Sequence, residues 1–160
     1  MIVKKITIIT PVKNIEAASF AIQSLVNIKN IQLEFIGLHH DIEGVATYFD
    51  RTMIAPEIIA LAYHAEKNGA DAVIINCLSE PGLQAAKELL TIPVMGIFEA
   101  TLSAIAKDKK HFSILLPQFH PDYLHMLQDT IRIHELQSLL TSLCCIDLAQ
   151  DLNDFLETHE

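Results

Sequence analysis

Cysteines are the residues of this 160-residue chain best suited to chemistry, and there are three of them: Cys77, Cys144 and Cys145. Cys77 ends an apolar run and is closely followed by Pro81 and Gly82, which open a predicted helix. The free N–H groups and partial positive charge of a helix start stabilise a thiolate. The pattern therefore predicts that Cys77 acts as a base or a nucleophile. The alternative is a buried, inert cysteine.

The other reactive residue types form no recognisable site. Cys144 and Cys145 lie inside an apolar run, which favours structural packing. The histidines lack the spacing of zinc ligands, so no metal site is predicted. The five glycines form neither a dinucleotide nor a phosphate-binding loop. One alternative is a hydrolase in which Cys77 is activated by one of His39, His40, His64 or His120.

Strands and helices are expected to alternate along the chain, and they must position Cys77. The predicted strands are residues 3–10, 31–38, 71–77, 94–97, 112–116 and 143–148. The predicted helices are residues 14–26, 56–69, 81–90, 99–107 and 121–140, with a short helix in the tail and a long loop over residues 39–55. Apolar strands between helices indicate a three-layer α/β/α fold with a mainly parallel sheet. Ligands bind beyond the carboxyl ends of such strands, and Cys77 lies at one of these ends.

Composition and charge restrict the partners. The net charge is −9 and no stretch gathers Lys and Arg, which argues against nucleic acid as a partner. No apolar run reaches the ~18 residues of a membrane span. The start of the chain lacks the pattern of a secretory signal. With few cysteines, a cytoplasmic protein is expected.

Four segments together resemble the hydantoin racemases of the Asp/Glu racemase superfamily, over about residues 6–127. They are residues 71–87 (DAVIINCLSEPGLQAAK), 92–100 (IPVMGIFEA), 41–44 (DIEG, followed by Tyr48 and Asp50) and 112–114 (FSI). The resemblance implies an Asp/Glu racemase-like fold of two lobes. Residues 1–110 would form the first lobe and residues 111–160 part of the second, which would be incomplete.

The resemblance also implies a function. It implies a cofactor-independent racemase in which two cysteines, on opposite faces of the substrate, remove and return the proton of the carbon beside a carbonyl. Cys77 would be the first of the pair, and Asn14, Glu43, Ser79 and Glu99 would bind or support the substrate. The substrate would be a small molecule with an acidic α-carbon: a hydantoin, an amino acid or a diacid.

The chain departs from the family pattern at the second cysteine, which is expected beyond Glu160. Val12 and the pair Leu116–Pro117 also replace polar substrate-binding residues of the family. These departures leave open an inactive relative that binds a small anion or a partner protein. An incomplete second lobe would expose apolar surface, so a homo-oligomer is expected.

Overall fold

The computed structural model describes residues 3–13, 15–16, 19, 22, 29–39, 42, 44–117 and 121–146. The chain divides into two compact units, Met1–Thr101 and Leu102–Glu160. The division falls within helix α4 (Ile97–Asp108), ahead of the lobe boundary expected at residues 110–111. The assignment of lobes stays a prediction.

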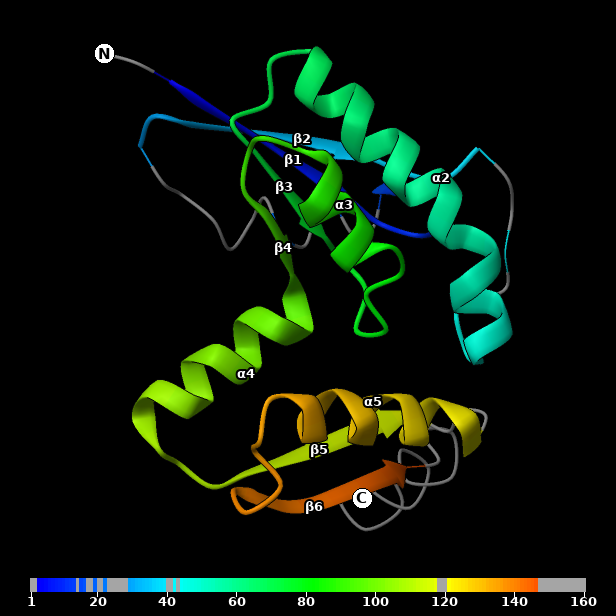
Figure 1. The fold of residues 1–160 in the computed structure, drawn as a ribbon, viewed down its shortest axis with the longest axis vertical. Coiled ribbons are helices and arrows are strands. Elements are labelled where there is room, and N and C mark those ends of the chain that lie inside the picture. Colours follow the sequence, from blue (N-terminus) through cyan, green and yellow to red (C-terminus); the bar gives the residue numbers. More distant parts are fainter. Residues whose placement is uncertain are drawn as a thin grey trace, which may run out of the picture. The chain divides into compact units, whose positions relative to one another are not determined.

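A four-stranded parallel sheet forms the centre of the first unit (Figure 1). Its strands, in spatial order, are β2 (Ile31–Ile36), β1 (Lys4–Ile9), β3 (Ala72–Ile75) and β4 (Val94–Gly96). All three neighbouring pairs are parallel, and Ile9 is in register with both Ile36 and Ile75. The carboxyl ends of the strands therefore meet at one edge of the sheet. The predicted α/β class with a mainly parallel sheet is confirmed.

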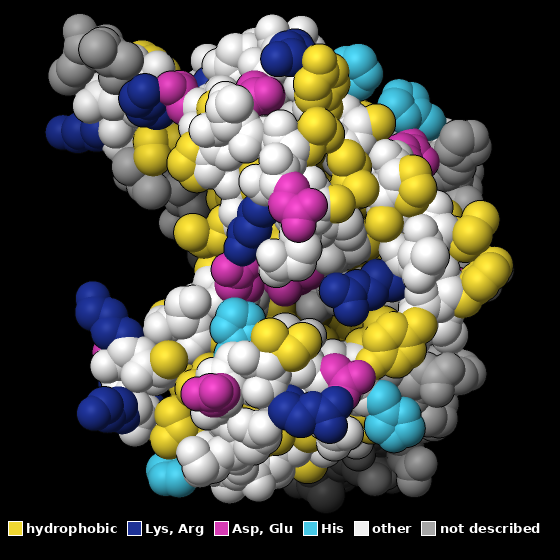
Figure 2. Space-filling view, in the orientation of Figure 1, with side chains coloured by type: hydrophobic (Ala, Val, Ile, Leu, Met, Phe, Trp, Pro, Cys, Tyr) yellow, Lys and Arg dark blue, Asp and Glu magenta, His cyan; other side chains and the backbone are white. Residues whose placement is uncertain are grey.

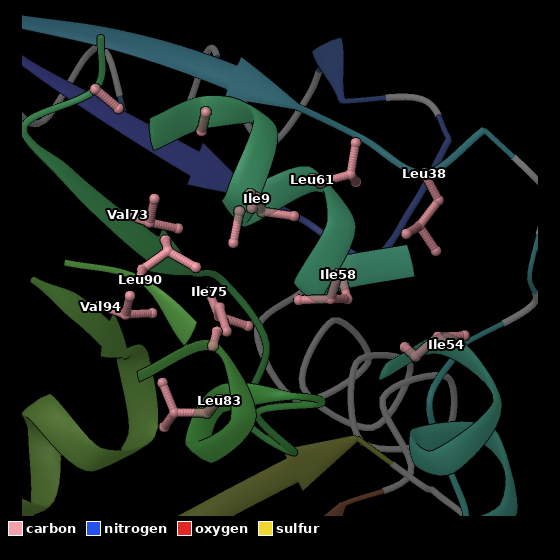
Figure 3. Packing of buried hydrophobic residues seen from close by; sticks show 14 residues of the cluster. Ile9, Leu38, Ile54, Ile58, Leu61, Val73, Ile75, Leu83, Leu90 and Val94 are labelled. Atoms are coloured by element: carbon pink, nitrogen blue, oxygen red, sulfur yellow. The ribbon is translucent and has the colours of Figure 1, made fainter. Parts of the chain in front are cut away.

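Helices α2 (Tyr48–Lys67) and α3 (Leu83–Leu89) pack against this sheet and against each other. Ile9, Ile58 and Ile75 are fully buried in the core, where side chains of α2, α3 and the sheet point toward one another (Figure 3). Burying one such aliphatic side chain contributes about 1.5–3 kcal/mol. The predicted helix over residues 14–26 lies largely outside the described residues.

Helix α2 begins earlier than the sequence suggested. The second half of the predicted 39–55 loop is helical, because Thr47 caps the helix and forms a capping box with Asp50. Pro56 consequently lies inside the helix rather than in its first turn. The helix ends at Lys67, and Gly69, which was expected to end it, follows with a φ of +82° that suits the left-handed position after a helix.

The second unit contains strands β5 (Phe112–Pro117) and β6 (Leu140–Ile146), which pair in parallel, and helix α5 (Pro121–Ile133). The predicted 121–140 helix was too long. It ends at Ile133 because Glu135 adopts a left-handed conformation (φ +56°) and Leu136 N–H donates to the Ile131 carbonyl. The strand expected at residues 143–148 accordingly begins at Leu140.

The distribution of charged side chains on the surface agrees with a sequence in which no stretch gathers Lys and Arg. On the face drawn in Figure 2, Lys and Arg side chains are interspersed with Asp and Glu among the described residues. Within the described part of the chain, no helix is both long and apolar enough to cross a membrane.

Candidate functional site

Cys77 lies in a turn, residues 77–82, that joins β3 to α3; we call it the Cys77 turn. Strand β3 ends at Ile75, so Cys77 follows the carboxyl end of a central strand, as predicted. The predicted helix, α3, begins at Leu83, six residues after Cys77, and spans seven residues, so support of the thiol by the helix start stays a prediction. Groups of the turn itself surround the thiol.

The Cys77 thiol is partly buried against the core, and its Sγ lies 3.1 Å from the Ser79 Oγ. Burial raises the pKa of this thiol; hydrogen bonds from the Ser79 hydroxyl and from the N–H groups of Ser79 and Glu80 oppose the rise, and the charge of Glu80 adds to it. The net pKa is raised. At neutral pH the thiol is thus protonated, whereas the sequence pattern had indicated a stabilised thiolate.

The middle of the turn is buried. Ser79 is 4% exposed and Glu80 5% exposed, which is unusual for a carboxylate. Glu80 has a left-handed backbone (φ +50°), and its Oε1 accepts the N–H of Glu99 at 2.7 Å. Glu80 was not among the predicted site residues, although its place between Cys77 and Pro81 was visible in the sequence.

Glu99, predicted to bind or support substrate, lies in the first turn of α4. Its carboxylate binds the Lys87 ammonium of α3 at 2.5 and 2.6 Å. Glu99 therefore joins three segments: its N–H holds the Cys77 turn and its side chain holds α3. Contact between Glu99 and substrate stays a prediction.

A second polar pair lies beside the turn. Asn76 Nδ2 donates to Thr10 Oγ1 at 3.1 Å, which links the residues that follow β3 and β1. Asn76 N–H also donates to the Ile9 carbonyl. Sequence reasoning missed both side chains. The position of Asn76 directly before Cys77 was the signal that could have identified it. No sequence pattern indicated its hydrogen bond to Thr10.

The remaining predicted residues are not brought to Cys77 by the described structure. Asn14 and Glu43 lie outside the described residues. His39 contacts Glu57 through its N–H and its Nδ1, at 2.7 and 2.9 Å, which gives no support to a Cys–His nucleophile. The described residues contain no cluster of three or more side chains able to hold a metal ion.

Cys144 and Cys145 lie in β6, where a strand was predicted. Both side chains are exposed. This exposure does not support the prediction that they serve structural packing. Leu143 stands in register with Ile114 and Cys144 with Leu115, and Leu115 is itself 66% exposed. Strand β6 thus has an apolar sequence without being buried along its whole length.

The fold and the site define an α/β protein with a shielded thiol at the carboxyl end of a parallel sheet. Residues 27–158 match the model of the Asp/Glu/Hydantoin racemase family. Because this match covers most of the sequence, the chain belongs to the Asp/Glu/Hydantoin racemase family. The predicted resemblance is confirmed.

Individual relatives agree with this assignment. The chain is 34% identical to a hydantoin racemase of Rhizobium meliloti over 90 residues, which are 55% of this chain and 36% of that protein. It is 31% identical to a hydantoin racemase of Paenarthrobacter aurescens over 114 residues, 69% of this chain and 48% of that protein. The matches therefore span less than half of these relatives.

The structure is also similar to that of an allantoin racemase from Klebsiella pneumoniae. The TM-score is 0.80, and the match covers 97% of this chain and 64% of that one at 21% sequence identity. At this identity the likeness establishes a shared fold.

Proposed function

We propose that this chain provides a cofactor-independent site at which Cys77 exchanges the α-proton of a hydantoin-like carbon acid. The observation that supports the proposal is the Cys77 thiol, shielded by the core and hydrogen-bonded to Ser79 at the sheet edge where parallel α/β folds bind ligands. Relatives named as hydantoin and allantoin racemases suggest a hydantoin ring as the substrate. Amino acids and diacids are the other substrate classes to test.

The chemistry is a proton transfer between sulfur and carbon. The Cys77 thiolate takes the proton of the carbon beside the carbonyl. The C–H bond breaks, an S–H bond forms, and the electron pair moves to the carbonyl oxygen as an enolate. In D₂O the thiol exchanges its proton with solvent and returns a deuteron to carbon. A shielded site suits this reaction because electrostatic stabilisation of the enolate is stronger where water is excluded.

The protonation state of Cys77 determines which half of the reaction it favours. Because burial raises the pKa of the thiol, the free chain holds Cys77 in the form that donates a proton. Removal of a substrate proton first requires ionisation of the thiol. We therefore expect the exchange rate to rise with pH toward the pKa of Cys77.

A second candidate is an inactive relative that binds a small anion. The raised pKa of Cys77 favours it, because a protonated thiol is a poor base at neutral pH. Calorimetric titration with a hydantoin and with the anion aspartate separates the two candidates when combined with exchange. Binding that survives Cys77→Ser, without any exchange in the parent chain, identifies the inactive relative.

The test of the proposed function is deuterium exchange followed by NMR. The purified chain is incubated in D₂O near neutral pH with 5-substituted hydantoins, allantoin, aspartate and glutamate, while polarimetry follows racemisation. Exchange that Cys77→Ala abolishes supports the proposal. Exchange at the level of Cys77→Ala with every substrate contradicts it. If racemisation accompanies exchange, a double Cys144→Ala/Cys145→Ala variant shows whether those thiols supply the second proton donor.

We propose a reducing compartment, the cytoplasm, for this chain, because all three cysteines are free and two are exposed. We also propose that the chain forms a homo-oligomer. Leu115 on β5 and Ile133 at the end of α5 are 66% and 77% exposed, and exposed apolar side chains of this size favour burial between protein chains.

A further inference from the structure

Glu80, in the middle of the Cys77 turn, carries a buried carboxylate. A carboxylate that is 5% exposed is stable only when hydrogen bonds replace the water it has lost. Glu80 Oε1 accepts the N–H of Glu99 at 2.7 Å, and Glu99 is the third residue of α4. The positive end of this 12-residue helix favours a negative charge at that place.

Gly96 provides the space for this carboxylate. A Cβ at Gly96 would lie 2.0 Å from Glu80 Oε1 and 2.4 Å from its Cδ, distances that no real side chain tolerates. The φ of Gly96 is not positive, so the glycine is required for space rather than for its backbone conformation. Gly96 ends β4, the strand that leads directly into α4.

The backbone of Glu80 is constrained as well as its side chain. Its φ of +50° lies in the left-handed region, which residues with a side chain adopt only at a cost in free energy. The hydrogen bond to Glu99 and the space at Gly96 hold Glu80 in this conformation. Because Glu80 N–H also donates to the Cys77 carbonyl, fixing Glu80 fixes the backbone on both sides of Ser79.

We propose that Glu80 is a positioning residue for Cys77: its carboxylate, seated over Gly96 and bound to the N–H of Glu99, locks the Cys77 turn onto the start of α4. The inference rests on the proposed function of Cys77 for its catalytic meaning. The inferred effect of Glu80 on the Cys77 thiol can be measured without a substrate.

The charge of Glu80 and its hydrogen bond to Glu99 can be removed separately by substitution. Glu80 is the charged side chain that acts on the thiol among the described residues, and its charge raises the pKa of Cys77. Lys87 and Glu99, on α3 and α4, are bound to each other. Glu80→Gln therefore removes the charge while retaining an acceptor for Glu99 N–H, whereas Glu80→Ala removes both.

The experiment measures the rate at which iodoacetamide alkylates Cys77 as a function of pH, with mass spectrometry of the peptides to separate Cys77 from the other cysteines. For Glu80→Gln we expect a lower pH midpoint and a rate at pH 7 about threefold higher, because the thiolate fraction rises. Glu80→Ala should raise the rate at least about tenfold, since the thiol also loses its shielding. The matched control is Glu88→Gln, which removes a charge from an exposed position of α3.

The Gly96→Ala variant tests whether the space at Gly96 is needed to hold the carboxylate of Glu80 in place. We expect it to raise the alkylation rate as Glu80→Ala does, and the double variant Glu80→Ala/Gly96→Ala to react no faster than Glu80→Ala, because both changes break one contact. Additive effects in the double variant overturn the inference. So does a Glu80→Gln variant that reacts like Glu80→Ala, or a Gly96→Ala variant that reacts at the parent rate.

Circular dichroism verifies that each variant is folded. If Gly96→Ala does not fold, the comparison of Glu80→Gln with Glu80→Ala decides alone. Alkylation needs no substrate, so the two proposals fail separately. The expected alkylation pattern without deuterium exchange supports the role of Glu80 and refutes the function of Cys77, and the reverse result does the opposite.

Discussion

Gly82 closes the Cys77 turn, and its replacement by alanine should be costly for two reasons. Its φ is +72°, and a left-handed backbone costs a residue with a Cβ about 1–2 kcal/mol. The added Cβ would also lie 2.9 Å from Ile59 Cγ1 and 3.0 Å from the Ala55 carbonyl oxygen, both on α2. Overpacking of this kind costs about 1–3 kcal/mol. We therefore expect Gly82→Ala to lower the free energy of unfolding by about 2–5 kcal/mol.

Gly69→Ala is the matched control for this prediction. Gly69 has a similar φ of +82°, but a Cβ there would have no heavy atom within 4 Å apart from those of Gly69 and its chain neighbours. The cost of the left-handed backbone and the reduced freedom of the unfolded chain are then common to both variants. The difference between them isolates the crowding against α2. Gly69→Ala should lose only about 1–2 kcal/mol.

Urea unfolding followed by far-ultraviolet circular dichroism measures both variants, because the chain has no tryptophan to serve as a fluorescent probe. Equal losses for Gly82→Ala and Gly69→Ala would refute the close packing of the turn on α2. Alkylation of Cys77 provides a second measure. If the turn is displaced locally, Cys77 of Gly82→Ala reacts faster under native conditions while Cys77 of Gly69→Ala does not.

Three further predictions concern the thiol, the pH dependence of stability and self-association. Ser79→Ala removes a hydrogen bond that lowers the pKa of Cys77, so alkylation at pH 7 should slow by about three- to tenfold; an unchanged rate would contradict this. The Lys4 ammonium and the Lys5 N–H lower the pKa of Asp71, so its contribution to stability is present above the unfolded pKa near 3.8 and is lost as pH falls. The stability advantage of the parent chain over Asp71→Asn should accordingly be full at pH 6 and vanish in acid, and a difference independent of pH would refute it. Light scattering should find an oligomer that Leu115→Glu weakens, whereas a monomeric parent chain would contradict the proposed assembly.

The strands of the first unit could be predicted to within two residues at every end. Strands β1, β3 and β4 are rich in apolar or β-branched residues, and β2 alternates apolar with polar residues. Both patterns are typical of strands. The start of α2 was missed because the segment before Pro56 has no clear periodicity, and Pro56 was therefore predicted to lie in the first turn of the helix. The better signal was local: Thr47 and Asp50 form a capping box that places the helix start at Tyr48.

The identity of Cys77 as the central residue could be read from the chain, but its environment could not. Its pKa depends on burial and on Glu80, and both follow from tertiary packing rather than from the neighbouring sequence. The contacts of Glu80 with Gly96 and Glu99 join positions far apart in the chain. A sequence pattern locates a turn, whereas the partners that hold the turn emerge only when separate strands are brought together.

The Cys77 turn is fixed from three directions. Asn76 is bound to Thr10 beyond β1, Gly82 is packed against α2, and Glu80 is bound to the start of α4 over Gly96. Every one of these contacts lies within Met1–Thr101. The hydrogen bonds and the close packing named here, which hold the turn, therefore all come from the first unit. Changes in the second unit, such as Leu115→Glu, should consequently leave the alkylation profile of Cys77 unchanged, and this makes alkylation a measure of the site that is independent of assembly.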